Sequence, residues 1–168
     1  MHKTIIILGS SRSDGNTKKA VAELNARKKM MLVDLNTLQI SPYDYEHKNQ
    51  NDDYLRLMEK ILDYDSIVLA TPIYWYTMST QMKIFIDRLT DCITLRKDIG
   101  RSLKDKKIYL LTSSGSPNLP EGFEDSFKNI CQYMNMDYKG CFLHYSGSNE
   151  NFINKNKEII KFSNLITL

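Results

Sequence analysis

The chain has 168 residues, the length of one domain that buries about 70% of its unfolded surface. Its composition, 42% hydrophobic and 26% charged, is typical of soluble globular proteins. The net charge of +3 is small and spread along the chain, which disfavours nucleic-acid binding, because that function usually requires a localised basic face. We expect a single domain over residues 1–168.

The cysteines and the apolar runs favour the cytoplasm as the cellular compartment. Cys92, Cys131 and Cys141 are odd in number and form no CxxC pair, which favours a reducing environment over a disulfide framework or a zinc knuckle. The first apolar run, residues 5–8, is too short for a signal peptide, and no run approaches the roughly 18 residues that span a bilayer. We expect a cytoplasmic protein without membrane association.

Short apolar runs alternate with stretches of helical periodicity. The predicted strands occupy residues 5–8, 31–35, 67–70, 108–111 and 138–145. The predicted helices begin near Asn16, at Asp52 or Asp53, at Ser79, near Phe123 and near Phe152. Residues 36–51 and 92–105 are predicted to be polar loops.

Five strands alternating with five helices indicate an α/β fold, in which helices cover both faces of a parallel sheet. The first strand is a continuous β-branched run, typical of a strand buried on both faces. Right-handed crossovers leave few topologies, but periodicity does not distinguish strand order 2-1-3-4-5 from other doubly wound orders.

The loop after the first strand has the chemistry of a phosphate site. Ligands of open α/β sheets bind beyond the carboxyl ends of the strands. Here Gly9 permits a tight turn, Ser10 and Ser11 offer hydroxyls, and Arg12 offers a charge-assisted contact. The helix that begins at Asn16 adds unpaired N–H groups. A plain strand-to-helix turn is the alternative interpretation of this loop.

The spacing of the residues in this loop limits the class of phosphate ligand that it can bind. A triphosphate loop requires GxxxxGK[ST], but five residues separate Gly9 from Gly15, and Asn16 stands in place of the lysine. A dinucleotide site requires GxGxxG, and Ser11 interrupts it. Asp34 is therefore interpreted as a loop-capping residue rather than a ribose ligand. With no cysteine nucleophile in the loop, a phosphatase is also disfavoured, and monophosphate binding remains.

Two further loops follow neighbouring strands. After the third strand, Tyr74, Trp75 and Tyr76 are three consecutive aromatic residues that could flank a planar ring, and Pro72 stiffens the turn before them. Coverage of an oligomer interface is the alternative for Trp75 and Tyr76. After the fourth strand, residues 112–117 form a small polar loop suited to the rim of the same crevice.

These motifs resemble the NADPH-dependent FMN reductase family. The resemblance is carried by residues 9–17, by residues 71–75 and by the stretch 78–89, and it follows the element order of nearly the whole chain. It implies a flavodoxin-like fold with strand order 2-1-3-4-5, FMN as cofactor, NAD(P)H as co-substrate, a small-molecule electron acceptor and a homodimer. Carried onto this chain, it implies the following binding residues: Ser10, Arg12, Asn16 and Thr17 for the phosphate; Pro72, Ile73, Tyr74 and Trp75 for the isoalloxazine ring; Ser113, Ser114 and Gly115 for its far edge.

Iron–sulfur flavoproteins, a branch of this family, carry cysteines in the loop after the second strand. Residues 41–47 contain none, which excludes a cluster at that place. His47 is expected to be a solvated loop residue and not a metal ligand.

The flavin would perform the redox chemistry while the protein positions it, so no side chain is nominated as a catalytic acid or base. Quinones, free flavin, nitro or azo compounds and ferric chelates all remain open as acceptors. A flavodoxin-like electron carrier is the alternative function. It is disfavoured because such carriers are acidic around the flavin, whereas these loops contain only Asp14. A flavin-free binding module also remains open.

Overall fold

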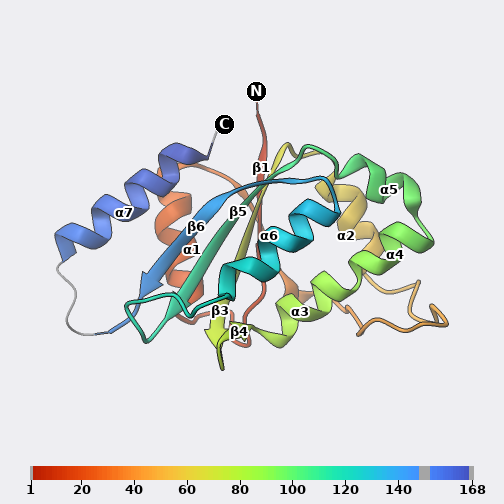
Figure 1. Ribbon diagram of the computed structural model, residues 1–168, viewed down its shortest axis with the longest axis horizontal. Helices are drawn as coiled ribbons and strands as arrows, with labels where there is room; N and C mark the ends of the chain where they lie inside the picture. Colours follow the sequence, from red (N-terminus) through yellow and green to blue (C-terminus); the bar gives the residue numbers. More distant parts are fainter. Residues whose placement is uncertain (1, 148–151, 167–168) are drawn as a thin grey trace.

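The computed structural model describes residues 2–147 and 152–166, with the backbone alone for residues 152–156. Five parallel strands lie in the order β2-β1-β3-β5-β6 (Figure 1). Their bounds are β1 (Thr4–Leu8), β2 (Met31–Asp34), β3 (Ser66–Tyr74), β5 (Lys107–Ser114) and β6 (Asp137–Tyr145). This arrangement confirms the flavodoxin-like α/β class. The sheet differs from the predicted one by a sixth strand, the two-residue β4 (Thr77–Met78), which pairs antiparallel with β3.

Helices cover both faces of the sheet, and the alternation of strand side chains divides the core in two. Ile6 and Leu8 of β1 pack with α1 (Asn16–Arg27) and α7 (Phe152–Leu165) on one face. Ile5 and Ile7 face the opposite core. That core is covered by α2 (Tyr54–Ile61), α3 (Thr80–Asp87), α4 (Leu89–Thr94), α5 (Lys97–Ser102) and α6 (Phe123–Tyr133). Figure 1 shows α1 and α7 together on one side and the other helices across the sheet.

Several predicted boundaries were wrong. Residues 92–105 are not a polar loop, because they hold the end of α4 and the whole of α5, and Cys92 and Ile99 are fully buried. The helix predicted from Ser79 is α3, which ends at Asp87, and a separate helix, α4, begins at Leu89. β3 and β5 each run several residues beyond their predicted ends. The helix predicted near Phe152 is α7, in which Ile159 is buried and Ile160 is exposed; the side chains of Phe152 and Ile153 lie outside the described residues.

The residue after β1 packs very closely against the first turn of α3. A Cβ on Gly9 would lie 2.9 Å from the Cβ of Met82, so only glycine fits this position without a shift. Ser79 caps α3 by accepting from the N–H of Met82 (3.2 Å) and donates through its hydroxyl to the carbonyl of Gly9 (2.8 Å). These contacts fix the first loop relative to the aromatic segment that precedes α3.

No helix within the described ranges is both long and apolar enough to cross a membrane.

Candidate functional site

A small polar crevice lies where β1, β3, β5 and β6 end. It has a volume of about 130 Å³, which leaves room for a phosphate group. The loops after four different strands therefore meet at one edge of the sheet, as expected for a parallel α/β fold. Its lining residues are Ser10, Arg12, Gly15, Asn16, Thr17, Pro72, Ile73, Tyr74, Ser113, Ser114, Gly115 and Ser146.

Arg12 lies directly over the N-terminus of α1. Its guanidinium nitrogens are 3.6 and 3.7 Å from the position that a Cβ on Gly15 would occupy. Gly15 is the N-cap of α1 and has no side chain to accept from the first N–H groups of the helix. A cation is disfavoured at a helix N-terminus, and no carboxylate in residues 2–147 or 152–166 forms an ion pair with Arg12. Two sources of positive potential thus face the same crevice, which suits an anion.

A buried hydroxyl pair forms the floor of the crevice. The Oγ1 of Thr17 and the Oγ of Ser113 lie 2.7 Å apart, and both residues are buried. One hydroxyl donates to the other, so the second keeps its proton for a different acceptor. The pair joins the first loop to the end of β5 and leaves one donor for a ligand oxygen in the crevice.

The aromatic segment forms a tight hairpin beside this crevice. Tyr74 pairs with Thr77, which leaves Trp75 and Tyr76 as the two-residue loop between β3 and β4. Both have positive φ, +47° for Trp75 and +67° for Tyr76, as a type I′ turn requires. Bulky residues rarely adopt this conformation. Their side chains are 92% and 74% exposed.

A second cleft, of about 370 Å³, separates the hairpin from the loop after β5. It shares Ile73 and Ser114 with the small crevice, so the two adjoin at these residues. None of its lining residues is charged. They are Ile73, Trp75, Tyr76, Ser114, Ser116, Asn118, Leu119 and Pro120. The larger cleft therefore has the size and the apolar, aromatic lining that a planar heterocycle requires.

The structure brings together ten of the twelve predicted site residues in the small crevice. Trp75 lines only the larger cleft, and the exposed Ser11 lines neither. Ser113 and Ser114 belong to β5 rather than to a loop.

The sequence analysis missed Gly15, Ser146 and Asn36. Ser146 follows β6 and donates through its N–H and hydroxyl to the carbonyl of Ser114 (2.9 and 3.0 Å). Asn36 donates through its amide to the carbonyl of Ser10 (2.5 Å). The signal for Ser146 and Asn36 was available, because each lies just after a predicted strand. Asp34 does cap its loop, since its carboxylate accepts from the N–H of Asn36 (3.0 Å).

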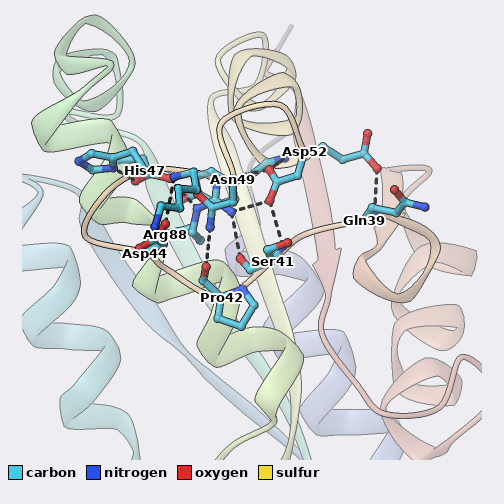
Figure 2. A network of polar contacts seen from close by, with 12 residues as sticks. Gln39, Ser41, Pro42, Asp44, His47, Asn49, Asp52 and Arg88 are labelled. Atoms are coloured by element: carbon cyan, nitrogen blue, oxygen red, sulfur yellow. Dashed lines mark hydrogen bonds and ion pairs between the residues drawn. The ribbon is translucent and has the colours of Figure 1, made fainter.

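The prediction that His47 is a solvated loop residue was wrong. Its Nδ1 lies 3.1 Å from a carboxylate oxygen of the buried Asp91, and its side chain is mostly covered. Figure 2 shows the loop around it, which encloses the fully buried Arg88. Arg88 pairs with Asp91 (2.5 Å) and with Asp52 (2.6 Å) and donates to the carbonyl of Ser41 (2.9 Å). This cluster has no opening to the crevice and is structural.

The cysteines do not supply a reactive thiolate. Burial raises the pKa of Cys92 to about 11 and that of Cys131 to about 12. Both thiols are therefore protonated at neutral pH. None of the three cysteines lines either cleft.

A doubly wound parallel sheet in this strand order, with a polar crevice at the end of β1 and an aromatic cleft beside it, is the arrangement of a flavodoxin-like protein. The family model for NADPH-dependent FMN reductase matches residues 2–147. The chain therefore belongs to this family of FMN-dependent oxidoreductases, in agreement with the resemblance drawn from residues 9–17 and 71–75.

The chain is also similar to individual proteins in sequence and in structure. The chain is 32% identical over 157 residues to a Bacillus subtilis (strain 168) protein named NAD(P)H-dependent FMN-containing oxidoreductase YwqN, covering 84% of this chain and 83% of that one. It superimposes on the Trp repressor binding protein of Bacillus subtilis with a TM-score of 0.76 and 25% identity, over 98% of each chain. The general stress protein 14 of Treponema denticola, solved with FMN, gives a TM-score of 0.65 at 19% identity, over 98% and 99%. At that identity the last similarity shows the fold alone.

Proposed function

We propose that the chain binds FMN across the two adjoining clefts and transfers electrons from NAD(P)H to a small acceptor. The observation that carries this proposal is Arg12 on the uncapped N-terminus of α1, with no carboxylate partner in the described ranges. An anion in the crevice would satisfy both groups at once.

The residues of the small crevice fit the phosphate of FMN, and those of the larger cleft fit its ring. Ser10, Arg12, Asn16 and Thr17, with the N–H of Ser11, would hold the phosphate at the end of β1. The isoalloxazine ring would lie in the larger cleft, between the hairpin residues 72–76 and the segment 113–120. Aromatic contacts with Trp75 or Tyr76 would add about 0.5–1.5 kcal/mol per stacked pair.

When bound, FMN supplies hydride acceptance and donation. The chain's part is to hold the ring and to exclude charge from its surroundings. Backbone N–H groups in residues 73–75 or 114–115 would donate to the polar edge of the ring, where negative charge develops on reduction. Because the cleft lining contains no titratable acid or base other than the phenol of Tyr76, we assign no catalytic side chain.

With an organic acceptor the overall reaction consumes NAD(P)H, a proton and the oxidised acceptor, and yields NAD(P)⁺ and the acceptor reduced by two electrons. With a ferric chelate, one NAD(P)H reduces two ferric ions and yields NAD(P)⁺ and a proton. Quinones, free flavin, nitro or azo compounds and ferric chelates, which would take one electron each, are the candidate acceptors. We also propose that the chain forms one domain, acts as a homodimer and works in the cytoplasm. The exposed aromatic hairpin and residues 92–105 are the proposed dimer contacts.

Reconstitution of the protein with FMN, followed by a screen of NADH and NADPH against these acceptors, tests the proposal. We expect a stoichiometric flavin complex that at least one nicotinamide bleaches and that turns over when an acceptor is added. A complex that neither nicotinamide reduces would contradict the enzyme assignment and favour a flavodoxin-like electron carrier. Absence of flavin binding would overturn the whole proposal.

A further inference from the structure

The backbone at the end of β1 alternates its hydrogen bonds between two sides. Gly9 uses both backbone groups on the β3 side: its N–H donates to the carbonyl of Ala70 (2.8 Å), and its carbonyl accepts from the hydroxyl of Ser79 (2.8 Å). The carbonyl of Ser10 points to the β2 side instead, where it accepts from the side-chain amide of Asn36 (2.5 Å). Asn36 therefore fixes the orientation of the Ser10–Ser11 peptide.

That orientation decides where the next donor points. In a trans peptide the carbonyl of one residue and the N–H of the next lie on opposite sides, and no described peptide is cis. With the Ser10 carbonyl held toward β2, the N–H of Ser11 is directed toward the β3 side. Thr17, Pro72 and Ser113 line the crevice there. The Ser11 N–H has no hydrogen-bond partner among the described residues, so it is free to donate to a ligand.

Asn36 is itself held in place. Its own N–H donates to the carboxylate of Asp34 (3.0 Å), and the hydroxyl of Thr37 donates to the carbonyl of Asp34 (2.7 Å). Leu35, at the start of the short 3₁₀ helix η1 (Leu35–Thr37), is buried in the core and anchors the turn. The amide therefore projects from a fixed turn at the end of β2, and it also approaches the hydroxyl of Ser13 (3.5 Å).

We infer that Asn36 is a positioning residue for phosphate recognition: it turns the Ser10–Ser11 peptide so that the N–H of Ser11 faces the anion. Asn36 does not line the crevice, and it acts through the backbone. This inference explains why Ser11 belongs to the binding loop although its side chain lines neither cleft. It rests on the proposed function, since the anion is the phosphate of FMN.

The test compares FMN with riboflavin, which has the same ring and no phosphate, on the apoprotein. Fluorescence titration gives both dissociation constants for the parent, for Asn36→Ala and for Asn36→Gln, which keeps the amide donor. We expect Asn36→Ala to weaken FMN about 2- to 12-fold, the effect of one lost hydrogen bond, while the riboflavin constant stays unchanged. Asn36→Gln should recover part of the FMN affinity.

Asn129→Ala is the matched control, because Asn129 is exposed on α6 and its side chain forms no hydrogen bond with the described residues. It should leave both constants as in the parent. A purely structural role for Asn36 would instead weaken FMN and riboflavin by the same factor, or leave both unchanged, and either result overturns the inference. A parent protein that binds neither flavin would contradict the proposed function itself, which is a separate outcome.

Discussion

At the scale of single residues, the site is defined by groups whose partners are missing from the chain. Arg12 covers Gly15 at a helix N-terminus with no paired carboxylate among the described residues. Thr17 and Ser113 share one hydrogen bond and leave one hydroxyl proton to donate. Each arrangement costs free energy in the absence of a ligand, because positive potential and an unused donor are placed together. An anion removes both costs.

We predict that Arg12→Ala weakens FMN binding by about 1.5–3 kcal/mol, which is the contribution of a hydrogen bond to a charged group and corresponds to roughly 10- to 150-fold in the dissociation constant. Flavin fluorescence titration of the apoprotein measures it. Arg56→Ala is the control, because Arg56 is exposed on α2 and lines neither cleft. Unchanged FMN affinity in Arg12→Ala would remove this residue from the site.

At the scale of elements, the strands were predictable and their ends were not. Residues 5–8 and 67–70 are apolar runs, and the local sequence alone is sufficient to predict that they form buried strands. The hairpin was missed because its loop lacks the Asn-Gly signature of a type I′ turn. The helices within 92–105 were missed because each has six residues, too few for periodicity to show, and charged residues surround the buried Cys92 and Ile99.

The same limits applied to the site. Residues in the three loops were nominated because small polar and aromatic residues follow the apolar runs. Asn36 was not nominated, although it follows the second predicted strand and the implied strand order places that strand beside the first, because a single asparagine after a strand forms no distinctive motif.

We predict that the loop of the β3–β4 hairpin lowers the stability of the fold and strengthens FMN binding. Replacing its loop by the favoured pair, Trp75→Asn with Tyr76→Gly, relieves two positive-φ aromatic residues and should raise the free energy of unfolding by about 1–2 kcal/mol. The same variant should bind FMN more weakly, because the aromatic wall of the larger cleft is lost. Urea unfolding and flavin titration measure the two effects. Tyr45→Ala, at another exposed aromatic residue, should not alter flavin binding. A variant that binds FMN as tightly as the parent would show that these rings do not contact the flavin.

We predict that the protein loses stability in acid because Asp52, in the loop shown in Figure 2, becomes protonated. Burial opposes ionisation of Asp52, but hydrogen bonds from Arg88 and from the N–H groups of Ser41 and Tyr54 outweigh it and lower the pKa of this carboxyl. A lowered folded-state pKa gives stability that is present above the unfolded value of about 3.9 and is lost as pH falls through the folded value.

Asp52→Asn should therefore reduce the free energy of unfolding at pH 7, by about 3–5 kcal/mol if Arg88 is left with one buried partner. It should also flatten the decline of stability below about pH 4. Urea unfolding across pH measures both effects. Asp125→Asn, at an exposed position on α6, provides the comparison. An equally steep acid decline in Asp52→Asn and parent would assign the acid sensitivity to other carboxylates.

At the scale of the whole molecule, the ligand site joins the carboxyl ends of four strands, so occupancy should stabilise the fold as a unit. Free FMN at 100 times its dissociation constant should add about 2.7 kcal/mol to the free energy of unfolding. For a chain of this size that corresponds to a rise in Tm of about 5–10 °C. Differential scanning calorimetry at increasing FMN concentration checks it, with riboflavin giving a smaller rise at equal concentration. A Tm independent of FMN would contradict binding to the folded state.

Trp75 is the single tryptophan of the chain, and its ring stands almost wholly in water at the mouth of the ring-sized cleft. Its ultraviolet emission is therefore a native optical reporter for that one place. An indole in water emits at long wavelength, and contact with a flavin quenches it by energy transfer. The protein thus carries a label-free signal by which flavin exchange between copies can be timed in a stopped-flow instrument.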